Sequence, residues 1–292
     1  MRLLVLGGSG QLGSELRALD LPPTVQLTAP PRAAVDLSNA AALDRLIAAE
    51  PWSAVINAAG YTNVDRAERE EALAFAINAE ACGRLGAATA RRGIPLIHVS
   101  TDYVFDGRKG APYVEADATM PLNVYGRSKL AGERRISTAN PRHVILRTAW
   151  LFSPFGNNFV RTILRLAQER ERLRVVADQL GCPTAACDLA KVCLDVAVRC
   201  AGAPDGAVYG TYHFAGAEAA TWFEFANAII AQAGGRLGRT VHVEPTATEH
   251  YGSPAARPAD SRLDCSAIAE AFGLKQPSWR PALADAVARL LA

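Results

Sequence analysis

A short apolar run that leads directly into a glycine-rich turn limits the folds open to this chain. Residues 3–13 read LLVLGGSGQLG, in which Gly8, Gly10 and Gly13 fit GxGxxG, and Gly7, Gly10 and Gly13 fit GxxGxxG. Glycine lets the backbone turn tightly and approach a pyrophosphate, whose charge the N-terminus of the next helix stabilises. Because a strand precedes the motif and a helix follows it, we predict a dinucleotide site. An ordinary strand–helix turn is the alternative.

The same alternation of strand and helix continues along the first half of the chain. Short apolar runs recur near residues 25, 54, 95 and 143, and the stretches 39–50, 70–93 and 158–171 carry apolar residues at helical spacing. Strands that alternate with helices are typical of a parallel sheet covered by helices. The pattern therefore predicts an α/β fold, with a Rossmann-type doubly wound parallel sheet.

The pattern loosens after Trp150, where loop-forming stretches such as SPFGNN, DQLGCPT and YGSPAARPAD separate shorter helices. We therefore predict two domains. Residues 1–150 are expected to form the dinucleotide-binding Rossmann domain, and residues 151–292 a smaller, less regular substrate domain. A segment near 184–214 is a candidate to pack back on the first domain.

Composition excludes several other classes of protein. The formal charge is +2, from 31 basic and 29 acidic residues, which gives no long-range attraction for nucleic acid or an anionic membrane. No apolar run approaches the roughly 18 residues of a membrane span. The six cysteines lack zinc-ligand spacing, and Met1 leads into RLLVLGG without a secretory cleavage pattern. We expect a cytoplasmic protein that binds neither nucleic acid nor a membrane.

The residues after the second apolar run indicate which dinucleotide is bound. An acidic residue there would hold the ribose hydroxyls of NAD, but VQLTA is followed by PPR, and no carboxylate appears before Asp36. Arg32 could hold a 2′-phosphate, so NADPH is predicted over NADH, with NADH as a secondary candidate. The alternatives are a solvated surface cation for Arg32 and a helix cap for Asp36. The small residues of NAAGYT (57–62) would let the backbone lie against the cofactor.

Tyr125 and Lys129, in VYGRSK, are four positions apart and lie on one face if this segment is helical. A neighbouring ammonium favours phenolate, so the pKa of Tyr125 is expected to fall from about 10 toward working pH. Ser100 and Thr101 follow the run PLIHVS and could donate a hydroxyl to a carbonyl oxygen. The set predicts ketone reduction by a hydride from nicotinamide and a proton from Tyr125. A helix-start tyrosine beside a strand-end cap is the alternative.

The order of the motifs resembles that of the extended short-chain dehydrogenase/reductases and, among them, the dTDP-4-dehydrorhamnose reductase family. The resemblance runs nearly end to end, and its more specific parts are NAAGYTNVDRAE, STDYVFDG, PLNVYGRSKLAGE, RTAWLF, GNNFV, DQLGCPT and RPADSRLD. It implies NADPH-dependent reduction of the 4-keto group of dTDP-4-dehydro-L-rhamnose to dTDP-L-rhamnose. It also implies a catalytic set of Thr101, Tyr125 and Lys129.

The resemblance and the glycine motif together give two sets of binding residues. The cofactor set is Gly7, Gly10, Gln11, Leu12, Gly13, Arg32, Asp36, Leu37, Ala58, Ala59, Gly60, Tyr61, Thr62, Val99, Tyr125 and Lys129. The set for the sugar nucleotide is Thr101, Asp102, Trp150, Asn158 and Arg257. Trp150 could instead be a core residue, and Arg257 an ordinary surface arginine.

Some members of the family are thought to dimerise through a magnesium ion held by glutamates. Only Glu15 matches that set, since AACD follows GCPT and the chain ends in alanine. We therefore predict no metal, and a monomer or homodimer.

Three other activities share parts of this pattern. A nucleotide-sugar 4,6-dehydratase typically has Asp and Glu after its threonine, whereas this chain has Asp102 and Tyr103. A nucleotide-sugar epimerase fits the motifs but must keep its cofactor through a closed redox cycle. A non-catalytic regulatory subunit of the methionine adenosyltransferase type also resembles the family, although an intact Thr101, Tyr125 and Lys129 set favours an enzyme.

Overall fold

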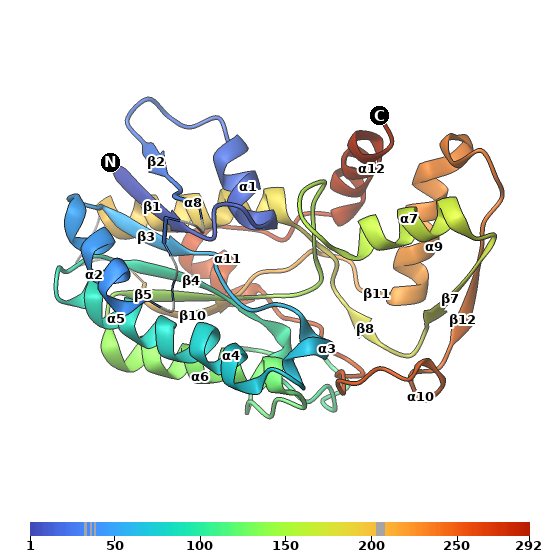
Figure 1. Ribbon diagram of the computed structural model, residues 1–292, viewed down its shortest axis with the longest axis horizontal. Helices are drawn as coiled ribbons and strands as arrows, with labels where there is room; N and C mark the ends of the chain where they lie inside the picture. Colours follow the sequence, from blue (N-terminus) through green and yellow to red (C-terminus); the bar gives the residue numbers. More distant parts are fainter. Residues whose placement is uncertain (32–33, 36, 38, 203–207) are drawn as a thin grey trace.

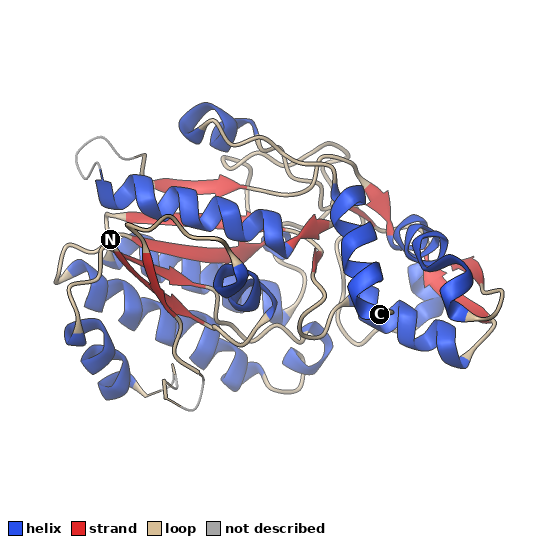
Figure 2. Ribbon diagram, turned by 90° about the horizontal axis from the view of Figure 1, so that it is seen from above, coloured by secondary structure: helices blue, strands red, loops and turns tan. Residues whose placement is uncertain are grey.

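The computed structural model describes residues 1–31, 34, 35, 37, 39–202 and 208–292. Arg32 and Asp36, two predicted cofactor residues, lie outside the described residues. The chain forms a larger lobe around a central sheet and a smaller lobe that extends from one end of it (Figures 1 and 2).

The central sheet has six strands, and all of its neighbouring strands run parallel. Their order in the sheet is β10-β5-β4-β3-β1-β2, which places the reversal of strand order between β1 and β3. This arrangement confirms the predicted doubly wound fold. The strands are β1 (Arg2–Leu6), β2 (Gln26–Thr28), β3 (Ala54–Asn57), β4 (Leu96–Thr101), β5 (His143–Thr148) and β10 (Gly210–His213).

Helices cover both faces of this sheet, so strand residues of both orientations are buried. Leu3, Val5 and Ile56 belong to one hydrophobic cluster, while Leu4 and Val55, from the opposite face, belong to another. Alternate burial on two faces explains why these strands read as continuous apolar runs. The first face packs α1 (Gln11–Ala18), α8 (Ala186–Gly202) and α11 (Ser266–Phe272), and the second packs α2 (Ala40–Ala49), α5 (Ala81–Ala90) and α6 (Val124–Ala139).

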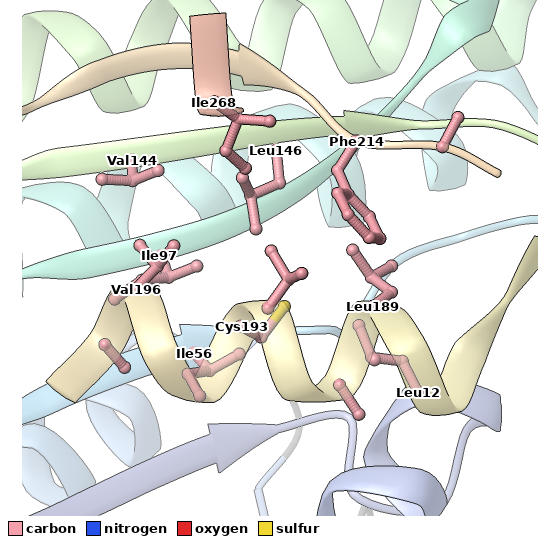
Figure 3. Close-up of a cluster of buried hydrophobic side chains, with 14 of the residues drawn as sticks. Leu12, Ile56, Ile97, Val144, Leu146, Leu189, Cys193, Val196, Phe214 and Ile268 are labelled. Carbon is pink, nitrogen blue, oxygen red and sulfur yellow. The ribbon is translucent and has the colours of Figure 1, made fainter. Parts of the chain in front are cut away.

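Helix α8 is the main cover of the first face. Its Leu189, Cys193 and Val196 project toward the strand residues Ile97 and Leu146 (Figure 3). Full burial of such a side chain contributes about 1.5–3 kcal/mol, which explains why a helix so late in the chain returns to this sheet.

The smaller lobe has its own hydrophobic core, to which α7, α9 and α12 contribute. Short strand pairs surround it, β7 with β12, β6 with β9 and β8 with β11. Its elements are β6 (Leu151–Phe152), α7 (Phe159–Glu169), β7 (Arg172–Val176), β8 (Leu180–Gly181), β9 (Thr184–Ala185), β11 (Ala220–Thr221), α9 (Trp222–Ala233), the 3₁₀ turn η3 (Gly234–Leu237), β12 (His242–Thr246), α10 (Thr248–Tyr251) and α12 (Trp279–Leu290).

The two cores do not follow chain order after residue 150. Residues 186–202 and 210–213 join the larger lobe as α8 and β10, and Leu263, Cys265 and α11 also pack in its core. A division of the chain at residue 150 therefore separates β1–β5 from later elements, but not one core from the other. The described helices include none that is both long and apolar enough to cross a membrane.

Four short elements lie close to the carboxyl edge of the sheet. They are α3 (Val64–Ala67), α4 (Glu71–Phe75), the π-helix η1 (Ala76–Glu80) and the 3₁₀ turn η2 (Asp102–Val104).

Candidate active site

A cavity of about 850 Å³ opens at the carboxyl ends of the central strands, where ligands of open α/β sheets bind. It is lined by the glycine loop, the ends of β3, β4 and β5, the start of α6, and residues of the smaller lobe. Most predicted site residues meet there. They are Gly7, Gly10, Gln11, Leu12, Leu37, Ala58, Ala59, Gly60, Tyr61, Thr62, Val99, Thr101, Asp102, Tyr125, Lys129, Trp150 and Asn158.

The glycine loop is built for close backbone approach. Gly7 has φ +84°, and a Cβ on it would lie 2.6 Å from the backbone nitrogen of Ala59. A Cβ on Gly13 would lie 2.2 Å from the carbonyl oxygen of Gly7, so α1 packs directly on the loop. Gly13 therefore lies behind the cavity wall and has a packing role. The cradle and the N-terminus of α1 fit the pyrophosphate of a dinucleotide.

Helix α6 places Tyr125 beside the end of β4. Asn123 caps the helix by accepting a hydrogen bond of 2.8 Å from the Gly126 amide, and its own amide donates to the Ala256 carbonyl at 2.7 Å. A Cβ on Gly126 would lie 2.2 Å from the Tyr103 carbonyl oxygen, so the first turn of α6 rests directly on η2. The phenol of Tyr125 consequently lies within hydrogen-bonding reach of Thr101.

The structure corrects the predicted pKa of Tyr125. Burial raises it from 10.0 to about 12, and its hydrogen bond with Thr101 offsets this only in part. The expected cation beside the phenol is directed elsewhere, because Lys129 Nζ donates to the Val99 carbonyl oxygen at 2.6 Å. Tyr125 is therefore a neutral phenol at neutral pH, which is the form that can donate a proton.

Lys129 itself is buried, and burial lowers its pKa. Its Nζ also lies 3.5 Å from Nε2 of His98, whose pKa burial and Lys129 both lower well below 6.5. Because the His98 imidazole is neutral, the Lys129 ammonium has no second positive charge from it close by. The Lys129 cation therefore lies against the floor of the cavity, near Gly60.

Asp102 follows Thr101 and is 2% exposed. Burial raises its pKa from 3.8 to about 7, although the nearby hydroxyls of Ser261 and Thr101 oppose this shift. Its Oδ1 accepts a hydrogen bond of 3.0 Å from the Thr101 hydroxyl, whereas Oδ2 has no partner in the described structure. The free oxygen lies on a residue that lines the cavity.

Trp150 both lines the cavity and packs against the two hydrophobic cores, so the predicted binding and core interpretations coexist. It has φ +46°, the only positive value outside glycine among the described residues. Its ring stacks on Trp222 with centroids 3.5 Å apart, and a Cβ on Gly181 would lie 2.4 Å from it. Trp222, at the start of α9, also lines the cavity, and no sequence motif had indicated it.

The remaining two predicted substrate residues differ in position. Asn158 Nδ2 donates to Gln11 Oε1 at 2.9 Å, so this side chain lies at the glycine loop rather than beside Tyr125. Arg257 does not line the cavity among the described residues. Its guanidinium forms two hydrogen bonds of 3.0 Å with the carboxylate of Asp65, a pairing that occupies the fork expected to hold a diphosphate.

Two buried supports were missed in the sequence. Asn78 accepts from the Tyr61 amide at 2.8 Å and donates to the Tyr61 carbonyl and Ser128 Oγ, each at 2.9 Å. It thereby ties the loop after β3 to α6, from within a π-helix of the kind often found at functional sites. A buried ion pair joins Glu133 of α6 to Arg147 of β5. The available signal was a polar residue within an apolar segment, Asn78 in AFAINA and Arg147 in VILR, whereas Glu133 stands among the other polar residues of α6.

Glu15, the single match to the metal set, is buried and accepts a hydrogen bond of 2.6 Å from Ser153. It therefore joins α1 to the smaller lobe. Within the part of the chain that the structure describes, no three His, Cys, Asp or Glu residues group as a metal site.

Comparison with known proteins agrees with this geometry. The family model described as the RmlD substrate binding domain matches residues 1–292. A dTDP-4-dehydrorhamnose reductase of Sinorhizobium fredii is 41% identical over 279 residues, which cover 96% of this chain and 94% of that protein. The chain belongs to the dTDP-4-dehydrorhamnose reductase family. The resemblance stated from the motifs is thereby confirmed.

Solved structures of this reductase family extend the match to three dimensions. The enzyme of Clostridium acetobutylicum superposes with a TM-score of 0.92 at 34% identity, with all of both chains covered. That of Bacillus anthracis, solved in complex with NADP, gives a TM-score of 0.89 at 34% identity and covers 99% of this chain and 98% of its own.

Proposed function

We propose that this chain catalyses the NADPH-dependent reduction of the 4-keto group of dTDP-4-dehydro-L-rhamnose, giving dTDP-L-rhamnose. Its membership of the reductase family and the NADP complex of the Bacillus anthracis relative support the reaction and the cofactor. The observation that carries the proposal is the meeting of Thr101, Tyr125 and Lys129 beside one cavity that also contains the glycine loop.

The residues divide the chemistry among themselves. When bound, NADPH supplies the hydride, and the cradle of Gly7, Gly10 and the loop after β3 would hold it. Thr101 would turn its hydroxyl from Asp102 and donate a hydrogen bond to the substrate carbonyl oxygen. Tyr125, held neutral by burial, would then donate its proton to that oxygen as negative charge develops there. Lys129 would hold the nicotinamide ribose.

One assay tests the reaction directly. The protein is mixed with dTDP-4-dehydrorhamnose, and NADPH absorbance is followed together with the product. We expect one NADPH consumed for each dTDP-L-rhamnose formed. An epimerase would change the sugar without net NADPH consumption. A regulatory subunit would capture a synthetase in a pull-down and turn over no keto-sugar.

The preference between cofactors is a separate prediction. Arg32 was predicted to accept the 2′-phosphate, so KM for NADPH should be lower than KM for NADH. Both constants are measured with the same keto-sugar, and a lower KM for NADH would contradict the assignment.

Lys129→Ala should weaken NADPH binding about 10- to 100-fold and lower kcat as well, because charge-assisted hydrogen bonds contribute about 1.5–3 kcal/mol. The dissociation constant is measured by fluorescence titration. Lys191→Ala is the matched control, since its ammonium pairs with Asp188 on an exposed surface. An unchanged NADPH affinity in Lys129→Ala would remove the ribose role.

Two further properties belong to the proposal. The six cysteines are all free thiols, which supports a reducing, cytoplasmic environment. A monomer or homodimer remains our expectation, and light scattering after size-exclusion chromatography measures which one forms.

A further inference from the structure

Thr148 ends β5 and lies opposite Thr101 of β4 in the register of the central sheet. It is 7% exposed and lines the cavity. Its hydroxyl is buried, yet it has no hydrogen-bond partner in the described structure. Thr148 belongs to the RTAWLF motif, but the sequence analysis assigned it no role in the site.

Among the described residues, Thr148 carries the only buried hydroxyl oxygen without a partner. Thr89 donates to the Leu85 carbonyl at 2.8 Å, and Thr184 donates to the Cys182 carbonyl at 3.0 Å. Buried polar groups in native proteins are nearly always paired, and one left unpaired costs about 1–3 kcal/mol. An unpaired hydroxyl on a residue that lines a ligand cavity is therefore expected to find its partner in the ligand, once the side chain turns its hydroxyl toward the cavity.

A second unpaired atom lies close by. Six side chains of the described residues have a buried polar atom without a partner, and of these only Asp102 and Thr148 line the cavity. Asp102 follows the last residue of β4, and Thr148 is the last residue of β5, the adjacent strand. Adjacent strands are about 4.8 Å apart, a distance that a single sugar ring spans.

We propose that Thr148 is a specificity-determining residue that hydrogen-bonds a ring hydroxyl of the keto-sugar, while Asp102 Oδ2 takes a neighbouring hydroxyl. The inference rests on the proposed function and deepens it. Thr101 would hold the reacting carbonyl oxygen, and Thr148 on the adjacent strand would then bind the sugar hydroxyl next to that carbonyl. Because hydroxyls both donate and accept, a pair of them satisfies a threonine and a carboxylate in either protonation state. An analogue that lacks a hydroxyl leaves a buried group unpaired and is rejected.

The test is Thr148→Val, which keeps the shape of the side chain and removes the hydroxyl. The dissociation constant of the product dTDP-L-rhamnose is measured by calorimetry, alongside kcat/KM for the keto-sugar, the Kd of NADPH and Tm. We expect product binding and kcat/KM to weaken about 3- to 10-fold, as for the loss of one neutral hydrogen bond. NADPH affinity should stay unchanged. Tm should stay unchanged or rise, because an unpaired buried hydroxyl has been removed.

Two variants separate recognition from packing. Thr148→Ser restores a hydroxyl and should recover most of the product affinity. Thr184→Val removes a buried hydroxyl that is already paired outside the cavity, so it should lower Tm and leave product affinity unchanged.

The outcomes are distinguishable. Wild-type affinity for the product in Thr148→Val would overturn the inference. Weaker NADPH binding with unchanged product binding would also overturn it, since the hydroxyl would then serve the cofactor carboxamide. A wild-type protein that binds the product but reduces no keto-sugar would refute the proposed function alone, and the affinity of Thr148→Val would still decide the role of Thr148.

Discussion

Tyr125→Phe is expected to lower kcat by roughly 100- to 10,000-fold, the usual contribution of general acid catalysis. The change removes the only atom that passes a proton and keeps the ring, which packs edge-on against Tyr103 with centroids 6.0 Å apart. NADPH affinity and Tm should therefore remain close to those of the wild type. Steady-state kinetics, NADPH titration and thermal unfolding measure the three quantities.

The matched control is Tyr212→Phe, which removes a phenol outside the cavity whose hydroxyl donates only to the Val208 carbonyl at 3.3 Å. Its kcat should equal that of the wild type. Near-wild-type kcat in Tyr125→Phe would exclude the phenol as proton donor and leave Thr101 or water in that role.

Local sequence patterns sufficed to predict the carboxyl edge of the sheet. Gly7 and Gly13 follow a strand and open a helix, and only glycine fits positions where a Cβ would collide with backbone. Tyr125 and Lys129, four residues apart, likewise lie on the same face of any helix that contains them. The spacing of these residues is a local signal, although the contact that requires Gly7 is with Ala59 in the loop after β3.

The wrong predictions concern side chains whose partners are set by packing between distant parts of the chain. Lys129 was expected to lower the pKa of Tyr125, but a carbonyl oxygen 30 residues away in sequence takes its hydrogen bond, and burial controls the phenol. Arg257 was expected to bind a diphosphate, but its guanidinium pairs with the carboxylate of Asp65, which is 192 residues away in sequence. Trp222 and Thr148 join the cavity only through the arrangement of the lobes and the register of β4 and β5.

Glu133→Leu is expected to lower the free energy of unfolding by about 3–5 kcal/mol, because removing one partner of a buried ion pair leaves an uncompensated charge. Arg147 Nη2 lies 2.7 Å from Glu133 Oε2, and the two side chains are only 7% and 5% exposed. Ser100 also donates to this carboxylate, so the change leaves two donors unpaired. Urea unfolding measures the loss. Glu169→Gln, which breaks an exposed pair with Arg165, should change stability by less than about 0.5 kcal/mol.

The double variant Glu133→Leu with Arg147→Met tests whether the ion pair serves only stability or also catalysis. Replacing both charges by apolar residues removes the uncompensated cation, so most of the lost stability should return. Catalysis should not return with it, because Glu133 lies one turn after Lys129 and holds Ser100, the residue before Thr101. We therefore expect near-wild-type unfolding energy with kcat still reduced. If kcat recovers together with stability, the ion pair serves folding alone and has no part in aligning β4 with α6.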